Sequence, residues 1–188
     1  MQTFCKQFLI ILCLLPPPML AASDQEPLWR NSPVVNHHAK VLNFYQDLIK
    51  GKTVAINFIF TTCSSSCPLA TAVFKQVQNQ LGAQQVQLIS ISVDPGTDTP
   101  ERLNAFAQQF KIKSGWSFIT GEEAIITALL EDLDAYTPDK ILHTNMVLVG
   151  NDATHNWIRL FGLPSAEMII NAFKNVTTQP TNARVSIR

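Results

Sequence analysis

The sequence contains little charge, and that charge is balanced. Only 15% of its 188 residues are charged, and 14 Lys and Arg offset 14 Asp and Glu. No basic or acidic run occurs, and phosphate backbones bind clustered Lys and Arg, so we expect no nucleic-acid partner. The 46% of hydrophobic residues indicates an ordinary globular protein. Without a leader, about 165 residues would remain, which suits one domain.

Cysteine is scarce as well. Cys5 and Cys13 lie near the N-terminus, and Cys63 and Cys67 lie in the body of the chain. One pair is too few for the disulfide framework of small secreted domains, and a domain of this size needs no disulfide for stability. The pair therefore indicates a functional dithiol, with an inert structural disulfide as the alternative.

The N-terminal apolar run is short. Residues 8–15 give about eight apolar residues, whereas a membrane span needs roughly 20. Three prolines follow at 16–18, and small residues at 21–23 offer a cleavage site. Residues 1–23 are therefore predicted to be a secretory signal peptide, with an uncleaved N-terminal anchor as the alternative. The leader lacks the Arg-rich character of a mitochondrial transit peptide, so we expect export to the bacterial periplasm, with an anchor placing the protein at the inner membrane.

Turn-forming residues divide the remainder of the chain. Residues 24–33 are polar and contain prolines, which indicates a linker, and residues 177–188 are predicted to be a flexible tail. The domain between them, residues 34–176, is predicted to open with a β-hairpin. His37 and His38 fall in its turn, and we interpret them as solvated because adjacent side chains rarely face the same way.

The first half of the domain predicts a parallel βαβ unit. Residues 53–60 and 86–93 are apolar enough for buried strands. Between them, helical spacing from Pro68 gives an apolar face containing Leu69, Val73 and Val77. The next helix is predicted to follow Thr99, a good N-cap before Pro100.

The second half predicts a short strand, a helix, two antiparallel strands and a last helix. Residues 115–119 are the short strand, and Thr120 to Glu123 fits a capping box for the helix. Residues 141–150 are predicted to be a strand that contains His143. An antiparallel strand and a helix ending near Lys174 follow. This order predicts an α/β, thioredoxin-like fold: a central mixed sheet flanked by helices, with an N-terminal β-hairpin.

The segment CSSSCP joins the first buried strand to its helix. A residue before proline avoids the helical conformation, so Cys67 is predicted to be the helix N-cap, with Cys63 in the preceding loop. Both sulfurs would then lie at the positive end of the helix dipole, which favours thiolate. Two such thiolates can form a reversible disulfide or bind a soft metal such as Cu(I). Structural zinc would need a second pair of ligands.

Four stretches carry a family resemblance. They are NFYQDLIKGKTVAINFIF, FTTCSSSCP, ISVDPGTDTPERL and HTNMVLVGNDATHNWIRLFG. With them the chain resembles the SCO/SenC family over roughly residues 33–175. The resemblance implies a thioredoxin fold outside the cytoplasm and a copper ion bound by Cys63, Cys67 and His143. Asp94 matches an acidic residue of the family near the site, and its alternative role is to open an Asp-Pro-Gly turn.

The resemblance implies a metallochaperone that helps assemble the dinuclear copper A site of cytochrome c oxidase. Its partners would be the copper-binding subunit of the oxidase and a copper donor protein. The alternative is a thiol–disulfide oxidoreductase in which Cys63 attacks and Cys67 resolves, served by a thiol reductant protein. A peroxidase would need an arginine beside its thiolate, which the loop lacks. His155, one strand after His143, is interpreted as a surface residue.

Overall fold

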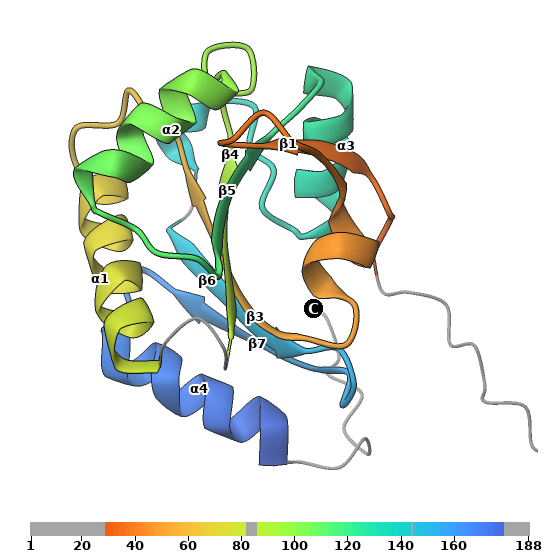
Figure 1. The fold of residues 1–188 in the computed structure, drawn as a ribbon, viewed down its shortest axis with the longest axis vertical. Helices are drawn as coiled ribbons and strands as arrows, with labels where there is room; N and C mark the ends of the chain where they lie inside the picture. Colours follow the sequence, from red (N-terminus) through yellow and green to blue (C-terminus); the bar gives the residue numbers. More distant parts are fainter. Residues whose placement is uncertain (1–28, 82–85, 144, 179–188) are drawn as a thin grey trace, which may run out of the picture.

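The computed structural model describes residues 29–81, 86–143 and 145–178 (Figure 1). The predicted signal peptide lies outside the described residues, as does the tail from residue 179 onwards. One mixed sheet runs through the molecule in the order β2-β1-β5-β4-β3-β6-β7. Its strands are β1 Pro33–Asn36, β2 Val41–Asn43, β3 Thr53–Ile59, β4 Gln87–Ser92, β5 Trp116–Thr120, β6 Met146–Asn151 and β7 Asn156–Phe161.

Helices cover both faces of this sheet (Figure 1). Among the described residues, the α-helices are α1 Ser66–Leu81, α2 Pro100–Gln109, α3 Glu123–Asp132 and α4 Ala166–Thr178. A π-helix, η1 Phe44–Ile49, and a 3-10 helix, η2 Lys140–Leu142, are shorter. In the part of the chain that the structure describes, no helix combines the length and apolarity needed to cross a membrane.

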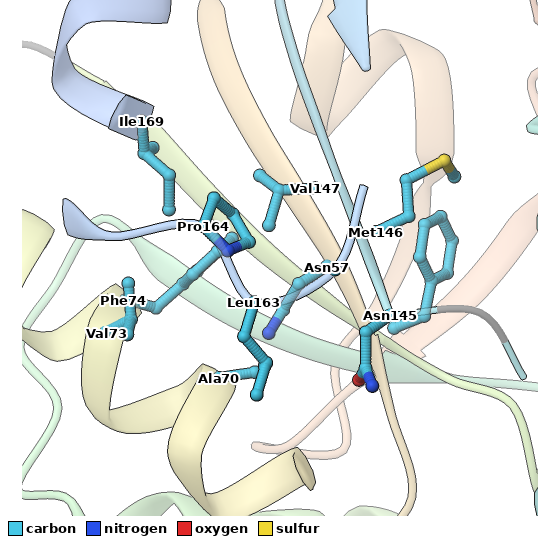
Figure 2. Close-up of a pocket in the computed structure, with 12 residues that line it drawn as sticks. Asn57, Ala70, Val73, Phe74, Asn145, Met146, Val147, Leu163, Pro164 and Ile169 are labelled. Carbon is cyan, nitrogen blue, oxygen red and sulfur yellow. The ribbon is translucent and has the colours of Figure 1, made fainter. Parts of the chain in front are cut away.

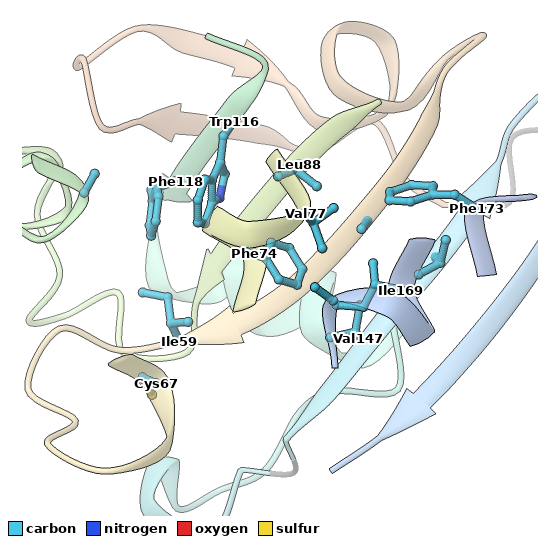
Figure 3. Close-up of a cluster of buried hydrophobic side chains, with 14 of the residues drawn as sticks. Ile59, Cys67, Phe74, Val77, Leu88, Trp116, Phe118, Val147, Ile169 and Phe173 are labelled. Atoms are coloured by element: carbon cyan, nitrogen blue, oxygen red, sulfur yellow. The ribbon is translucent and has the colours of Figure 1, made fainter. Parts of the chain in front are cut away.

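The strand β3 lies inside the sheet, parallel to β4 and antiparallel to β6. Its side chains alternate between two hydrophobic clusters, as the period of a strand requires. Ala55 and Ile59 pack with α1, α2 and α4 on one face, and Val54 and Ile56 pack with α3 and η1 on the other. The predicted βαβ unit and the buried central strand are thus confirmed, and β3 ends at Ile59, before the loop that leads to Cys67 (Figure 3).

The predicted apolar face of α1 is partly wrong. Leu69 is 59% exposed, whereas Thr71 and Gln78 are buried with Phe74 and Val77. These polar side chains can be buried because they form hydrogen bonds within the protein. Gln78 Nε2 donates to the Lys113 carbonyl at 2.8 Å, and its Oε1 accepts from Lys113 N at 3.0 Å.

Of the caps predicted for α2 and α3, one is confirmed. Thr99 caps α2, and its hydroxyl accepts from Arg102 N. The predicted capping box of α3 is wrong: the N-cap is Glu122 and makes no side-chain cap hydrogen bond. Thr120 is instead the last residue of β5, where it pairs with Val35 of β1. Strand pairing holds this residue in an extended conformation one turn before the helix starts.

The N-terminal hairpin is confirmed, but His37 is not solvated. Its side chain is 6% exposed, its Nδ1 accepts from Phe118 N at 3.2 Å, and its own N–H donates to the Phe118 carbonyl. The backbone of His37 therefore continues the pairing of β1 with β5. Burial, followed by the nearby His38, lowers the pKa of His37. His38 is exposed, as predicted.

Both predicted ends of the domain need correction. Trp29, in the predicted linker, is buried and packs edge-on against Trp157 with ring centroids 4.1 Å apart. Arg30 pairs with Asp132. The last helix does not end near Lys174 but continues to Thr178, because Val176 is buried against the sheet. Each segment contains an apolar residue, Trp29 or Val176, that is buried in the structure although its neighbours in the sequence are mostly polar.

Candidate metal and redox site

The two cysteines lie together at the start of α1. Cys67 is the second residue of this helix, so the prediction that it is the N-cap is wrong. The Cys63 sulfur instead accepts the Cys67 backbone N–H at 3.4 Å, as a capping side chain would. A proline in the first helical turn explains the difference, since its missing N–H needs no partner there. The preference of the preceding residue for extended structure is overridden.

The two thiols differ strongly in acidity. Partial burial would raise the pKa of the Cys63 thiol, but hydrogen bonds from the Cys67 thiol and from the backbone N–H groups of Cys67 and Ser65 lower it to about 7. Burial raises the pKa of the Cys67 thiol to about 12, and its hydrogen bond to Cys63 adds to the effect. The prediction of thiolate character therefore agrees with the structure at Cys63 and is wrong for Cys67.

His143 presents one ring nitrogen without a partner. The residue follows η2 and precedes β6, so the prediction that it lies within a strand is wrong. Its Nδ1 lies 2.8 Å from the Lys140 carbonyl, which can only accept, so Nδ1 carries the proton. Its Nε2 is buried and has no hydrogen-bond partner. An imidazole held through one nitrogen, with the other free of hydrogen bonds, is the usual arrangement of a metal-ligating histidine.

Phe60 connects the dithiol to this histidine. Its carbonyl accepts the Cys63 N–H at 3.2 Å, and its backbone also hydrogen-bonds to the Cys67 sulfur. Its ring meets the His143 ring in a T-shape with centroids 5.5 Å apart. Among the described residues, no group of three or more His, Cys, Asp or Glu is arranged closely enough to hold a metal ion. The structure thus brings Cys63 and Cys67 together, and Phe60 contacts this pair through its backbone and His143 through its ring.

Asp94 does more than open a turn. Its carboxylate receives Lys140 Nζ at 2.6 Å, and its side chain is only 14% exposed. The same ammonium lies 5.9 Å from the centroid of the Phe60 ring. Asp94 therefore ties η2, and with it His143, to the loop that follows β4. Its carbonyl also accepts the Asp98 N–H at 2.8 Å, so the turn interpretation holds beside the ion pair.

Sequence reasoning missed Asp98, the carboxylate that holds the cysteine loop. Asp98 is fully buried and accepts from Thr61 N, the Thr61 hydroxyl and the Ser92 hydroxyl. Thr61 is the second residue before Cys63, so Asp98 fixes the exit of the chain from β3. The sequence pointed to Asp98 only through its position in the motif ISVDPGTDTPERL. The motif does not show whether an acidic side chain in it is buried or exposed.

We expect Asp98→Ala to lower the free energy of unfolding by about 3 kcal/mol, because Thr61 N–H and the Ser92 hydroxyl lose a charged acceptor in the interior. Urea unfolding of the reduced protein measures the change. The control is Asp132→Ala, whose partner Arg30 is exposed and which should cost about 1 kcal/mol or less. Equal effects of the two substitutions would contradict the role assigned to Asp98.

Comparison with known proteins places the chain. The model of the SCO1/SenC family matches residues 33–175. This chain belongs to the SCO1/SenC family. The SCO1 protein homolog of Bacillus subtilis is 33% identical over 121 residues, which are 58% of this chain and 63% of that relative. A Stutzerimonas stutzeri protein, provisionally named as copper-binding, is 31% identical over 81 residues, which are 42% of this chain and 39% of the relative. The matches therefore span less than two thirds of either relative.

A solved structure supports the same placement. BsSco, described as a member of the Sco family of cytochrome c oxidase assembly proteins with a disulfide switch, superposes with a TM-score of 0.66. It is 26% identical and covers 82% of this chain and 97% of its own. The resemblance inferred from the four sequence stretches and the predicted thioredoxin-like fold are confirmed for this SCO1/SenC protein.

Proposed function

We propose that this protein is a copper-binding metallochaperone that assists assembly of the dinuclear copper A site of cytochrome c oxidase. The observation that carries the proposal is the buried Nε2 of His143, which has no hydrogen-bond partner, on a ring that packs against Phe60, the residue whose backbone contacts both free cysteines. Two thiolates and an imidazole form a soft donor set that suits Cu(I). Family membership and the copper-binding name of one relative point to the same cargo.

Cys63, Cys67 and His143 would have different roles in binding copper. Cys63, whose pKa is about 7, offers a thiolate at neutral pH, while Cys67 must lose its proton as the ion binds. His143 would supply the third ligand through its Nε2. Ligand exchange then passes the ion from a donor protein to the copper-binding subunit of the oxidase. The signal peptide predicted at residues 1–23 supports export to the periplasm, where that exchange would take place.

An anaerobic titration of the reduced protein with Cu(I), against a chromophoric Cu(I) chelator, tests the ligand set. We expect one tight equivalent, a loss of affinity of at least about tenfold in His143→Ala, and a larger loss in Cys63→Ala. The control His155→Ala removes an exposed histidine and should bind as the parent does. Binding that is indifferent to His143→Ala would remove His143 from the ligand set.

The second candidate is a thiol–disulfide oxidoreductase, favoured by the difference in acidity between the thiols. The Cys63 thiolate would attack a partner disulfide and release one partner thiolate. Cys67, after losing its proton, would then attack Cys63 and release the other. The partner gains two electrons, and the Cys63–Cys67 disulfide formed is reduced again by a thiol reductant protein. This activity would survive His143→Ala, whereas copper delivery would not, so one variant separates the two candidates.

A further inference from the structure

The ring of His143 is held by the main chain of one residue, Lys140. The Lys140 carbonyl lies 2.8 Å from His143 Nδ1 and also accepts the main-chain N–H of His143 at 3.4 Å. A carbonyl can only accept, so the ring proton stays on Nδ1, and Nε2 keeps the lone pair that a metal ion requires. The position of this carbonyl therefore decides which ring nitrogen His143 offers.

The chain on the two sides of His143 is anchored differently. On the C-terminal side, the Asn145 carbonyl accepts the Gly162 N–H at 2.7 Å, just before β6 begins (Figure 2). On the N-terminal side lies η2, a short 3-10 helix in which Ile141 and Leu142 are 75% and 72% exposed. Apolar packing therefore contributes little to holding η2, and the hydrogen bonds inside a 3-10 turn have poor geometry.

The side chain of Lys140 supplies a tertiary anchor for η2. Its Nζ lies 2.6 Å from Asp94 Oδ2, and the Asp94 side chain is only 14% exposed. The same ammonium lies 5.9 Å from the centroid of the Phe60 ring, which packs against the ring of His143. The main chain of Asp94 is itself fixed, because its N–H donates to the Ser92 hydroxyl at 3.0 Å. One ion pair therefore connects η2 to the end of β4.

The loop that follows β4 holds both parts of the candidate site. Asp98 accepts from Thr61, which leads to the cysteines. Asp94 accepts from Lys140, which leads to His143. The Asp98 N–H also donates to the Asp94 carbonyl at 2.8 Å, so the two carboxylates belong to one hydrogen-bonded turn. The turn therefore fixes the histidine side of the site relative to the cysteine side.

We propose that the ion pair between Asp94 and Lys140 positions His143 for metal binding. The pair holds the Lys140 carbonyl where it keeps the proton on His143 Nδ1 and leaves Nε2 as the donor to the metal. Asp94 and Lys140 are positioning residues, since both act through His143. The identity of the metal rests on the proposed function, whereas the orientation of the ring is a property of the metal-free protein.

Long-range ¹H–¹⁵N NMR of the reduced, metal-free protein tests the orientation, because the ¹⁵N shifts of an imidazole show which nitrogen carries the proton. In mildly basic solution, where free imidazole is neutral, we expect the Nδ1–H form of His143 in the parent. Lys140→Met keeps the main-chain carbonyl but removes the ammonium, so it should transfer part of the population to the Nε2–H form. Lys140→Arg keeps the positive charge and should restore the spectrum of the parent.

Competition with a chromophoric Cu(I) chelator measures the consequence for binding. Lys140→Met and Asp94→Asn should each bind Cu(I) about tenfold more weakly, and neither should lose more than His143→Ala does. The double variant should be no weaker than either single one, because both substitutions remove the same contact. In a His143→Ala background, Lys140→Met should have no further effect. The control Arg30→Met breaks the ion pair with Asp132 and should match the parent in both measurements.

Two results would overturn the inference. The first is a His143 spectrum in Lys140→Met that is identical to that of the parent. The second is an equal loss of Cu(I) affinity from Lys140→Met with and without His143, because the lysine would then act through its charge alone. If His143→Ala binds Cu(I) as tightly as the parent, the proposed ligand set fails. A shifted spectrum in Lys140→Met and a restored one in Lys140→Arg would then still support the positioning of the ring.

Discussion

At pH 7, reduced Cys63 should react with iodoacetamide at least about 100-fold faster than Cys67. With pKa values of about 7 and about 12, roughly half of Cys63 but only about one part in 10⁵ of Cys67 is thiolate at this pH. A thiolate of lower pKa is intrinsically less nucleophilic, and this reduces the rate advantage of Cys63 by on the order of two powers of ten. The remaining difference in rate is a few hundred-fold, roughly, and burial of Cys67 adds to it.

Mass spectrometry of the alkylated peptides measures both rates in one sample. The Cys63 rate should rise with pH through a midpoint near 7, because deprotonation creates the reactive form. Cys67→Ala should move that midpoint upward, since the Cys67 thiol is the first of the groups that stabilise the Cys63 thiolate. Ser64→Ala changes an exposed loop residue and serves as the control. Similar rates at the two cysteines would contradict the assigned acidities and, with them, the choice of Cys63 as nucleophile.

Gly150→Ala should lower the free energy of unfolding by about 3 kcal/mol. A Cβ atom at this position would lie 1.8 Å from Cε3 of Trp157, which pairs with Gly150 across β6 and β7. The indole cannot simply retreat, because Trp29 packs against it at 4.1 Å. Its displacement would also loosen the N-terminal segment that Trp29 holds on the sheet. For a chain of this size the melting temperature should fall by about 6–12 °C.

Thermal unfolding followed by tryptophan fluorescence measures this change. Gly96→Ala is the matched control, since a Cβ there meets nothing within 4 Å, and it should be close to neutral. In a Trp157→Ala background the same Gly150 substitution should cost little, because the clash is gone. An equal cost of Gly150→Ala in both backgrounds would show that the close approach of Trp157 is not the cause.

Much of the fold follows from short-range pattern. The apolar run of β3 and the Thr99–Pro100 start of α2 are each evident within a few residues of sequence, and both are confirmed. The same holds for the chemical type of the site. Two cysteines between a buried strand and a helix specify a dithiol, and the surrounding motifs specify the family.

The tertiary structure decided what depends on distant partners. The sequence predicted wrongly that His37 is solvated. The hydrogen bond that His37 accepts from Phe118 N joins segments far apart in the chain, so the sequence around His37 does not reveal it. Gln78 and Asp98 are buried for the same reason, since Lys113 and Thr61 satisfy them from other elements. Polarity read along the chain cannot reveal such a pairing.

The candidate site shows the same division. The sequence by itself identified the candidates: Cys63 and Cys67, whose thiols suit a soft metal or disulfide exchange, and His143, which the family resemblance adds as a metal ligand. Only the tertiary structure decided how unequal they are, because burial and hydrogen-bond direction set the two thiol pKa values and left His143 Nε2 without a partner. Both quantities depend on what surrounds an atom in space, and neighbours in the sequence make up only a small part of those surroundings.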